Sequence, residues 1–132
     1  KSLSNEEQEF FIKSNYVDQS ILIWISICRT YKFIGDFASM IISEKFNSYQ
    51  INLNYDDFNY FYEQQKVLHE ELNSLKDSTR KKLRQVIFRI MKELNLISKR
   101  EEITPLLPSK EIKEISITTN RDMQLFLPGV LI

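Results

Sequence analysis

The longest apolar stretch of the chain is VDQSILIWISICRTYKFIGDFASMIISEKF, residues 17–46. Isoleucines alternate at positions 21, 23, 25 and 27, a pattern that a strand would also show. The apolar positions continue at helical spacing through 33, 34, 37, 40 and 41, and a run of this length predicts helix. Gly35 then indicates either close packing between helices or a bend between two of them, because one uninterrupted helix would lose about 1 kcal/mol there relative to alanine.

The centre of this stretch, SILIWISIC at residues 20–28, predicts a buried core helix. Its apolar run is about nine residues long, whereas a helix that crosses a bilayer needs roughly 20. Asp18 and Arg29 flank it, so we expect no membrane insertion, with Asp18 as the helix N-cap and Arg29 paired with Asp18 or Asp36. The single cysteine, Cys28, excludes an internal disulfide; we expect a buried thiol and a cytoplasmic location.

The composition favours one all-α domain. A chain of 132 residues can bury a substantial core. Two glycines and three prolines are few helix breakers for this length. We therefore expect a compact helical bundle that forms a single domain over residues 1–132.

The remaining elements follow from capping residues and apolar spacing. Helices are predicted after Ser4 and after Asn54, and short helical turns after Ser109 and after Asn120. A short β-hairpin near residues 97–104 is a further expectation. The residues expected to face the core from these segments are Phe10, Phe11, Ile12, Phe58, Phe61, Tyr62, Val67, Met123, Leu125, Phe126 and Leu127.

The stretch DSTRKKLRQVIFRIMKELN, residues 77–95, predicts a strongly basic amphipathic helix that starts behind Asp77 or Ser78. Between positions 80 and 92 it holds six Lys and Arg residues and no acid. Leu83, Val86, Ile87, Ile90, Met91 and Leu94 form its inner stripe. The side chains expected opposite that stripe are Lys81, Gln85, Phe88, Arg89 and Lys92, with Lys82 at the margin and Arg80 and Arg84 beside the stripe. Asn95 suits a left-handed helix end.

Helix stability does not explain this concentration of positive charge. Cations near the start of a helix oppose its macrodipole, and like charges three or four residues apart repel. The chain has no formal net charge, yet residues 1–79 hold seven Lys and Arg against twelve Asp and Glu, and residues 80–132 hold eleven against six. A phosphate backbone would account for the basic helix, and so would an acidic protein surface.

Sequence motifs of enzymes are missing. His69 is the single histidine, so the two-histidine zinc helix motif cannot form. Gly35 and Gly129 lie too far apart for a phosphate-binding loop. Adjacent acids such as Glu70 and Glu71 indicate solvated helix faces rather than an opposed catalytic pair. We expect no catalytic residue, metal ligand or cofactor, and no small-molecule substrate.

Three stretches together resemble a known family: WISICRTYKFIGDFASMIISEKF (24–46), LNYDDFNYFYEQQKVLHEELNSLKDSTRKKLRQVIFRIMKELNLIS (53–98) and ITPLLPS (103–109). They resemble BrxA, a small non-enzymatic component of the BREX phage-defence systems of bacteria, a family formerly described as inner-membrane proteins. The resemblance implies an all-helical, NusB-like fold, binding to double-stranded DNA, and work beside other BREX components. Family members also carry an N-terminal helical region, so we expect this chain to be a fragment that lacks it.

The basic helix and the resemblance lead to one functional hypothesis. The protein is expected to bind double-stranded DNA without sequence preference, as an accessory protein of a BREX system. The expected contacts are Arg80, Lys81, Lys82, Arg84, Gln85, Arg89, Lys92, Lys99 and Arg100. The alternative is a protein-interaction scaffold whose basic helix docks an acidic partner. The oligomeric state is left open by both.

Overall fold

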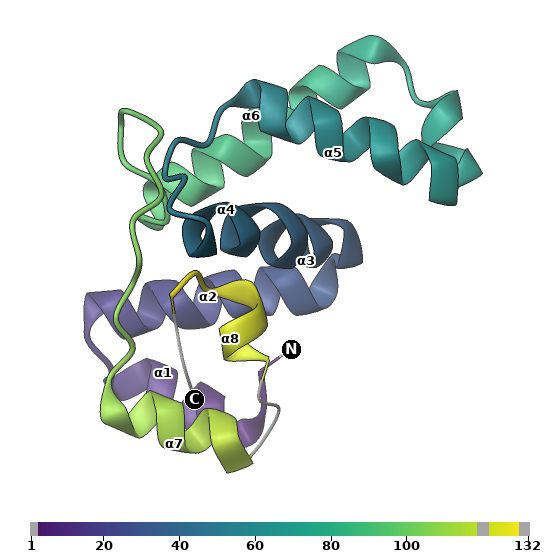
Figure 1. The fold of residues 1–132 in the computed structure, drawn as a ribbon. Helices are drawn as coiled ribbons and strands as arrows, with labels where there is room; N and C mark the ends of the chain where they lie inside the picture. The colour runs from purple at the N-terminus through teal and green to yellow at the C-terminus, as the bar shows by residue number, and fades with distance from the viewer. Residues whose placement is uncertain (1–2, 119–121, 130–132) are drawn as a thin grey trace.

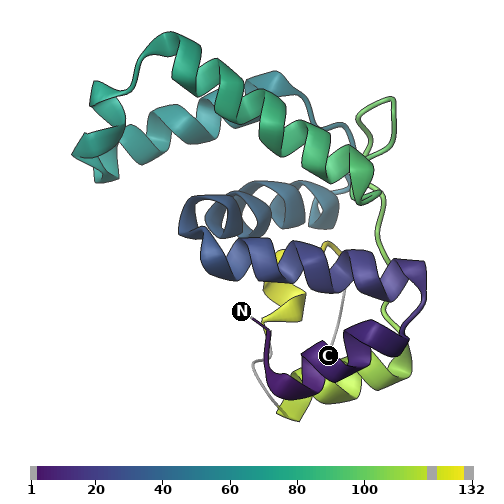
Figure 2. The ribbon, with the colours of Figure 1, turned by 180° about the vertical axis from the view of Figure 1, so that it is seen from behind.

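The computed structural model describes residues 3–118 and 122–129, and within them the fold is all-α, as predicted. Figure 1 shows helices α2 to α4 across the middle of the molecule. Helices α5 and α6 form an arm on one side of this layer, and α1 and α7 lie on the other side (Figure 2). The arm and the α1–α7 pair thus occupy opposite ends of the protein.

Helix α1 (Asn5–Lys13) starts at the predicted cap. The Ser4 hydroxyl accepts a hydrogen bond from the Glu7 backbone N–H at 3.2 Å, and the Glu7 carboxylate accepts one from the Ser4 N–H at 2.9 Å. This reciprocal pair is a capping box. Phe10 and Phe11 pack partly against the core. Ile12, expected beside them, is 78% exposed, because three consecutive helical residues cannot all face one side.

Helix α2 (Tyr16–Thr30) is the buried core helix that its apolar run predicts. Its cap is Asn15, not Asp18: the Asn15 side chain accepts the Asp18 backbone N–H at 2.9 Å. Asp18 is itself buried within the helix and accepts the Ser109 backbone N–H at 3.1 Å, which ties the distant segment before α7 to α2. No helix among the described residues is long and apolar enough to cross a bilayer.

Helix α3 (Lys32–Phe37), the π-helical segment η1 (Ala38–Ile42) and α4 (Ser43–Asn47) form one continuous rod. The chain breaks from α2 at Tyr31, which is extended, so the bend precedes Gly35 by four residues. Gly35 instead marks close packing. A Cβ atom there would lie 2.7 Å from the backbone oxygen of Cys28 and 3.3 Å from the Phe126 ring.

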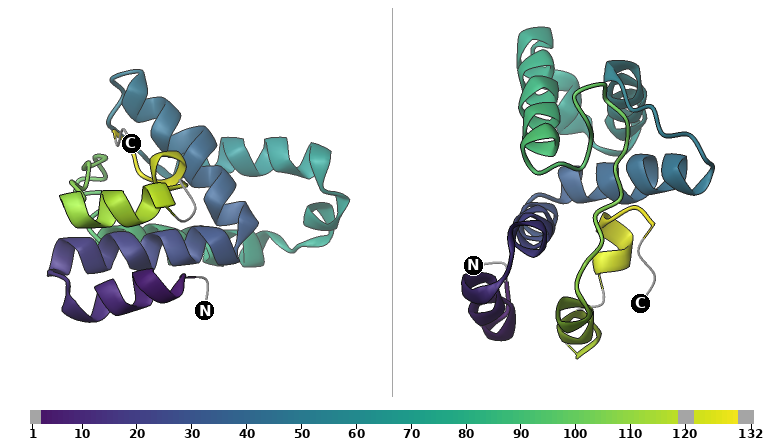
Figure 3. Two further views of the ribbon diagram at one scale, coloured as in Figure 1. Left: turned by 90° about the horizontal axis from the view of Figure 1, so that it is seen from below. Right: turned by 90° about the vertical axis from the view of Figure 1, so that its left-hand side faces the viewer.

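The arm consists of α5 (Tyr55–Leu68), the 3-10 segment η2 (Glu70–Ser74) and α6 (Asp77–Glu93). Asn54 caps α5 as predicted, in a capping box with Asp57. Phe58, Phe61 and Tyr62 are buried, but Val67 is 82% exposed. Val67 lies near the outer end of α5, where the arm extends past the rest of the molecule (Figure 3).

The segments after α6 cross back over the body. Asn95 adopts a φ of 63°, the left-handed helix end that was predicted. The expected hairpin is reduced to two isolated bridges, Ile97 to Ile103 and Asn52 to Glu102. Helix α7 (Lys110–Thr118) follows Ser109 as expected, and α8 (Met123–Phe126) packs against α2 and η1.

The C-terminal packing agrees in part with the prediction. Met123 and Leu127 are buried, whereas Leu125 is 54% exposed because the four-residue α8 turns only one side to the core. The capping role expected of Asn120 lies outside the described residues. Trp24 donates its indole N–H to the Phe126 backbone oxygen at 3.0 Å and so anchors α8 to α2.

Candidate nucleic-acid interface

The buried side of α6 is broader than the predicted apolar stripe. Ile87 and Met91 are buried as expected. Phe88, predicted to face outward with the cations, is only 2% exposed, and its ring meets that of Tyr55 edge-on at 4.9 Å between centroids. Helix α6 packs against both the core and α5, so more than one stripe of its surface is buried. Phe88 therefore offers no exposed ring for base stacking.

Arg84 holds α6 against α5. Its guanidinium lies 4.1 Å from the centroid of the Tyr55 ring, and its Nη1 donates to Asn59 Oδ1 at 3.1 Å. The Arg84 Nε is buried and has no hydrogen-bond partner among the described residues. The stack is a cation–π contact, which planar arginine makes well.

Arg80 makes similar contacts one turn earlier. Its Nη1 donates to the same Asn59 oxygen at 3.0 Å, its guanidinium lies 5.9 Å from the Tyr62 ring centroid, and it pairs with Asp77. The hydrogen bond and charge of Arg80 hold the pKa of the exposed Asp77 carboxyl below its usual value. One shared acceptor, Asn59, thus offsets the repulsion between two arginines spaced four residues apart.

Two lysines of α6 have acidic partners near the surface, the exposed Asp77 and the half-buried Glu101. Lys81 lies 3.4 Å from Asp77, and Lys92 lies 3.5 Å from Glu101. Exposed pairs of this kind are screened and exchange easily with other anions. The Lys92–Glu101 contact also brings the turn at residues 98–101 beside the end of α6.

Lys82, Gln85 and Arg89 line the exposed side of α6 at steps of three and four residues. They therefore share one side of the helix over about 10 Å, at 1.5 Å per residue. Neither Lys82 nor Arg89 has a carboxylate within 4.0 Å in the described part of the chain, and the same is true of the exposed Lys99 and Arg100. Figure 2 shows α6 along the outer edge of the molecule, leading into the turn at 98–101.

We call this exposed surface the basic ridge. It is formed by Lys81, Lys82, Gln85, Arg89, Lys92, Lys99 and Arg100. Seven of the nine residues singled out from the sequence are thus exposed on α6 or on the turn beside its end, while Arg80 and Arg84 lie between α5 and α6. Flexible cations on an exposed helix can neutralise a row of phosphates but do not by themselves read base sequence.

A second charged group, centred on Arg29, is structural. Arg29 binds Glu7 through two contacts of 2.8 and 3.2 Å and Asp122 through two of 2.6 and 2.7 Å. The predicted pairing with Asp18 or Asp36 is wrong, since Asp18 binds the backbone of Ser109 and Asp36 binds Lys32. The partners lie 22 and 93 residues away along the chain, beyond any local pattern.

The carboxylates around Arg29 also set its protonation. Burial pushes the pKa of Glu7 upward, but hydrogen bonds from Arg29 and the Ser4 backbone, with the Arg29 charge, bring it below its usual value. Burial likewise opposes the charge on Arg29, yet its two carboxylate partners raise the arginine pKa. Glu7 and Arg29 are therefore both charged at neutral pH, and the group around Arg29 joins α1, α2 and the start of α8.

The described residues offer neither a metal site nor a reactive thiol. No set of three His, Cys, Asp or Glu side chains there could hold a metal ion. Cys28 is buried as predicted, and burial, reinforced by the negative charge of Asp122, raises the pKa of its thiol. A thiol in such surroundings is a poor nucleophile, because the thiolate is the reactive form.

Comparison with known proteins places the chain in a family. No curated protein matches it. Its fold is similar to the crystal structure of an uncharacterized protein from Magnetospirillum magneticum, with a TM-score of 0.76 and 18% sequence identity. The match covers 91% of this chain and 65% of that protein, so it spans less than two thirds of that protein's length. Residues 1–117 match the BrxA family, and the chain belongs to that family.

Proposed function

We propose that this protein binds double-stranded DNA through the basic ridge, as a non-enzymatic accessory protein of a BREX system. The observation that carries the proposal is the row of exposed cations on α6, which has no acid between Arg80 and Lys92. Membership of the BrxA family supports the BREX context. Arg80 and Arg84 act indirectly in this proposal, by holding α6 against α5.

The chemistry of the ridge favours phosphate contacts over base contacts. Six of its seven residues are lysines or arginines, and Gln85 is the only uncharged one. Such contacts fix the position of a protein on a duplex and release counterions, but they carry no sequence information. Binding is therefore expected to be similar for random duplexes and to weaken as salt rises.

The test is a fluorescence anisotropy titration of a random-sequence duplex at about 50 mM salt. The variant Lys82→Gln/Arg89→Gln removes the two ridge cations of α6 that lack an ion pair. We expect it to bind at least about tenfold more weakly, because each lost phosphate contact removes one released counterion. Unchanged affinity in this variant would contradict the proposal.

A matched control separates the ridge from overall charge. Lys13→Gln/Lys110→Gln also removes two exposed lysines, from α1 and α7 at the opposite end of the molecule (Figure 1). Both double variants have the same net charge, so general attraction to DNA changes equally. The control should bind within about twofold of the original chain. If the ridge instead docks an acidic protein, the ridge variant keeps its DNA affinity and loses co-purification with the other BREX proteins.

A further inference from the structure

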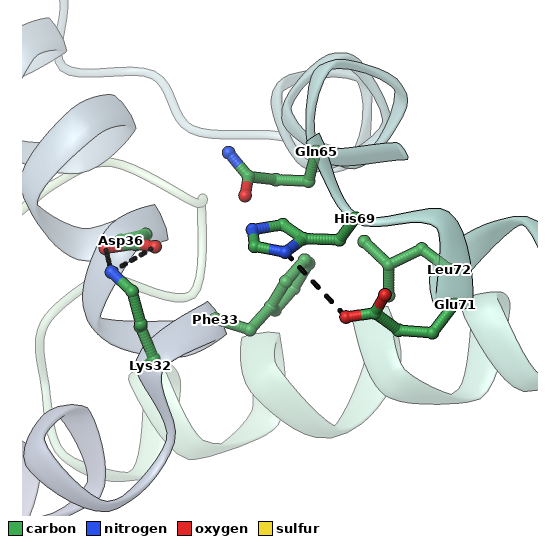
Figure 4. A pocket seen from close by; sticks show the side chains of 7 residues that line it. All are labelled: Lys32, Phe33, Asp36, Gln65, His69, Glu71 and Leu72. Carbon is green, nitrogen blue, oxygen red and sulfur yellow. Dashed lines mark hydrogen bonds and ion pairs between the residues drawn. The ribbon is translucent and has the colours of Figure 1, made fainter. Parts of the chain in front are cut away.

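A pocket of about 270 Å³ opens where the arm meets α3. Figure 4 shows the side chains that line it. They are Lys32, Phe33, Asp36, Gln65, His69, Glu71 and Leu72. This volume is slightly smaller than the pockets of about 300–1,000 Å³ that hold drug-sized ligands, and it suits one long side chain. The pocket shares no residue with the basic ridge.

Gln65 is the unusual member of the pocket. The residue is 4% exposed, yet its side-chain amide makes no hydrogen bond with any residue that the structure describes. Figure 4 shows the amide directed into the pocket, beside the His69 ring and on the side that faces Asp36. Neither amide atom is among the buried side-chain atoms that lack a partner, so both remain accessible from the pocket. The pocket therefore holds an unused donor and acceptor at a fixed position.

The charged side chains that line the pocket indicate the sign of charge that its ligand carries. Asp36 and Glu71 supply two carboxylates, and the one ammonium group, of Lys32, lies 3.2 Å from Asp36. The Glu71 carboxylate lies 3.7 Å from Nδ1 of His69 (Figure 4). This excess of negative charge disfavours a phosphate or a carboxylate ligand and favours a cation.

The apolar side chains of the pocket also favour a cationic ligand. Phe33 and Leu72 line the pocket, and Phe33 belongs to an aromatic cluster with Phe58, Phe61 and Tyr62. Aromatic rings attract cations, and an arginine stem of three methylene groups packs well on apolar surface. Arginine also offers five planar donors, enough for both an amide oxygen and a carboxylate.

We propose that this pocket binds an arginine side chain of a protein partner. The Gln65 amide oxygen and the carboxylates of Asp36 and Glu71 accept hydrogen bonds from the guanidinium, and its stem lies against Phe33 and Leu72. The inference goes beyond DNA binding and uses a different surface. The protein would then hold DNA at the basic ridge and a partner protein at the pocket.

The experiment is an NMR titration of the whole chain with N-acetyl-arginine amide, observed at the Gln65 side-chain NH2 and the His69 ring. Saturable shifts confined to the pocket are expected. N-acetyl-citrulline amide, which has nearly the same shape without the charge, should bind about tenfold or more weakly, since hydrogen bonds to charged groups are the stronger ones. Equal binding of both probes, or no saturable shift with arginine, would overturn the proposal.

Two variants and one competing ligand complete the design. Gln65→Leu removes the amide at similar volume, and Glu71→Gln changes an exposed rim residue with little risk to folding. Both should weaken arginine binding, Gln65→Leu by about tenfold. Lys81→Gln on the ridge is the control and should bind arginine normally. Adenosine binding more tightly than the arginine probe would refute the proposal and make the pocket a nucleobase site.

Discussion

Replacing Arg29 with methionine should destabilise the protein severely. Methionine matches the length of the apolar stem but removes all four contacts to Glu7 and Asp122. The Glu7 side chain is 1% exposed, so its carboxylate would stay buried with only the hydrogen bond from the Ser4 backbone N–H. Breaking a buried ion pair from one side costs about 3–5 kcal/mol. That is a large share of the roughly 5–15 kcal/mol by which a typical domain is stable.

Urea unfolding at pH 7, followed by circular dichroism, measures this loss directly. The matched control is Lys66→Met, which removes a lysine paired with the more exposed Glu63 and should cost less than about 1 kcal/mol. Adding Glu7→Gln to Arg29→Met should recover part of the loss, because a neutral amide is less costly to bury than a carboxylate. If Arg29→Met were no less stable than Lys66→Met, the reasoning about the buried charge group would be refuted.

Three further predictions concern stability. The folded-state pKa of Glu7 lies below its usual 4.5, so the stability that its carboxylate contributes is complete above that pH and is lost as pH falls through the folded-state pKa. In urea unfolding, Glu7→Gln should therefore lose less free energy of unfolding between pH 5 and pH 3 than the original chain does. Gly35→Ala should lower the thermal midpoint of unfolding, because the added Cβ would lie 2.7 Å from the Cys28 backbone oxygen. Overpacking of this kind costs about 1–3 kcal/mol, whereas alanine gains about 1 kcal/mol in helix propensity over glycine. Arg84→Lys keeps the charge but loses the planar contacts with Tyr55 and Asn59, so urea unfolding should show a loss of about 1–2 kcal/mol while DNA affinity stays within about twofold.

Most of the helices can be predicted from residues that lie close together in the sequence. The caps at Ser4 and Asn54 and the helix end at Asn95 were predictable because each depends on residues within three or four positions. The close packing at Gly35 was one of two readings of that glycine, and the structure selects it. Asp18 shows the limit of the approach: it has the chemistry of a cap, but Asn15 precedes it and takes that role.

The candidate interface was predictable in composition but not in detail. Helical spacing correctly gave Ile87 and Met91 as inner residues, yet it could not show that α5 covers a second side of α6. Phe88 is buried there for that reason, and Arg84 is engaged with Tyr55. The Arg29 partners and the Gln65 pocket depend on segments far apart in the chain, which one sequence cannot bring together.

The salt dependence of duplex binding tests the central claim most directly. The basic ridge offers six cations, and each neutralised phosphate contributes about −0.9 to the slope of log K against log salt. Between about 50 and 200 mM salt, full engagement predicts a slope near −5, and Lys82→Gln/Arg89→Gln should bring it about two units closer to zero. A slope near zero, or the same slope in the chain and in that variant, would contradict DNA binding through this ridge.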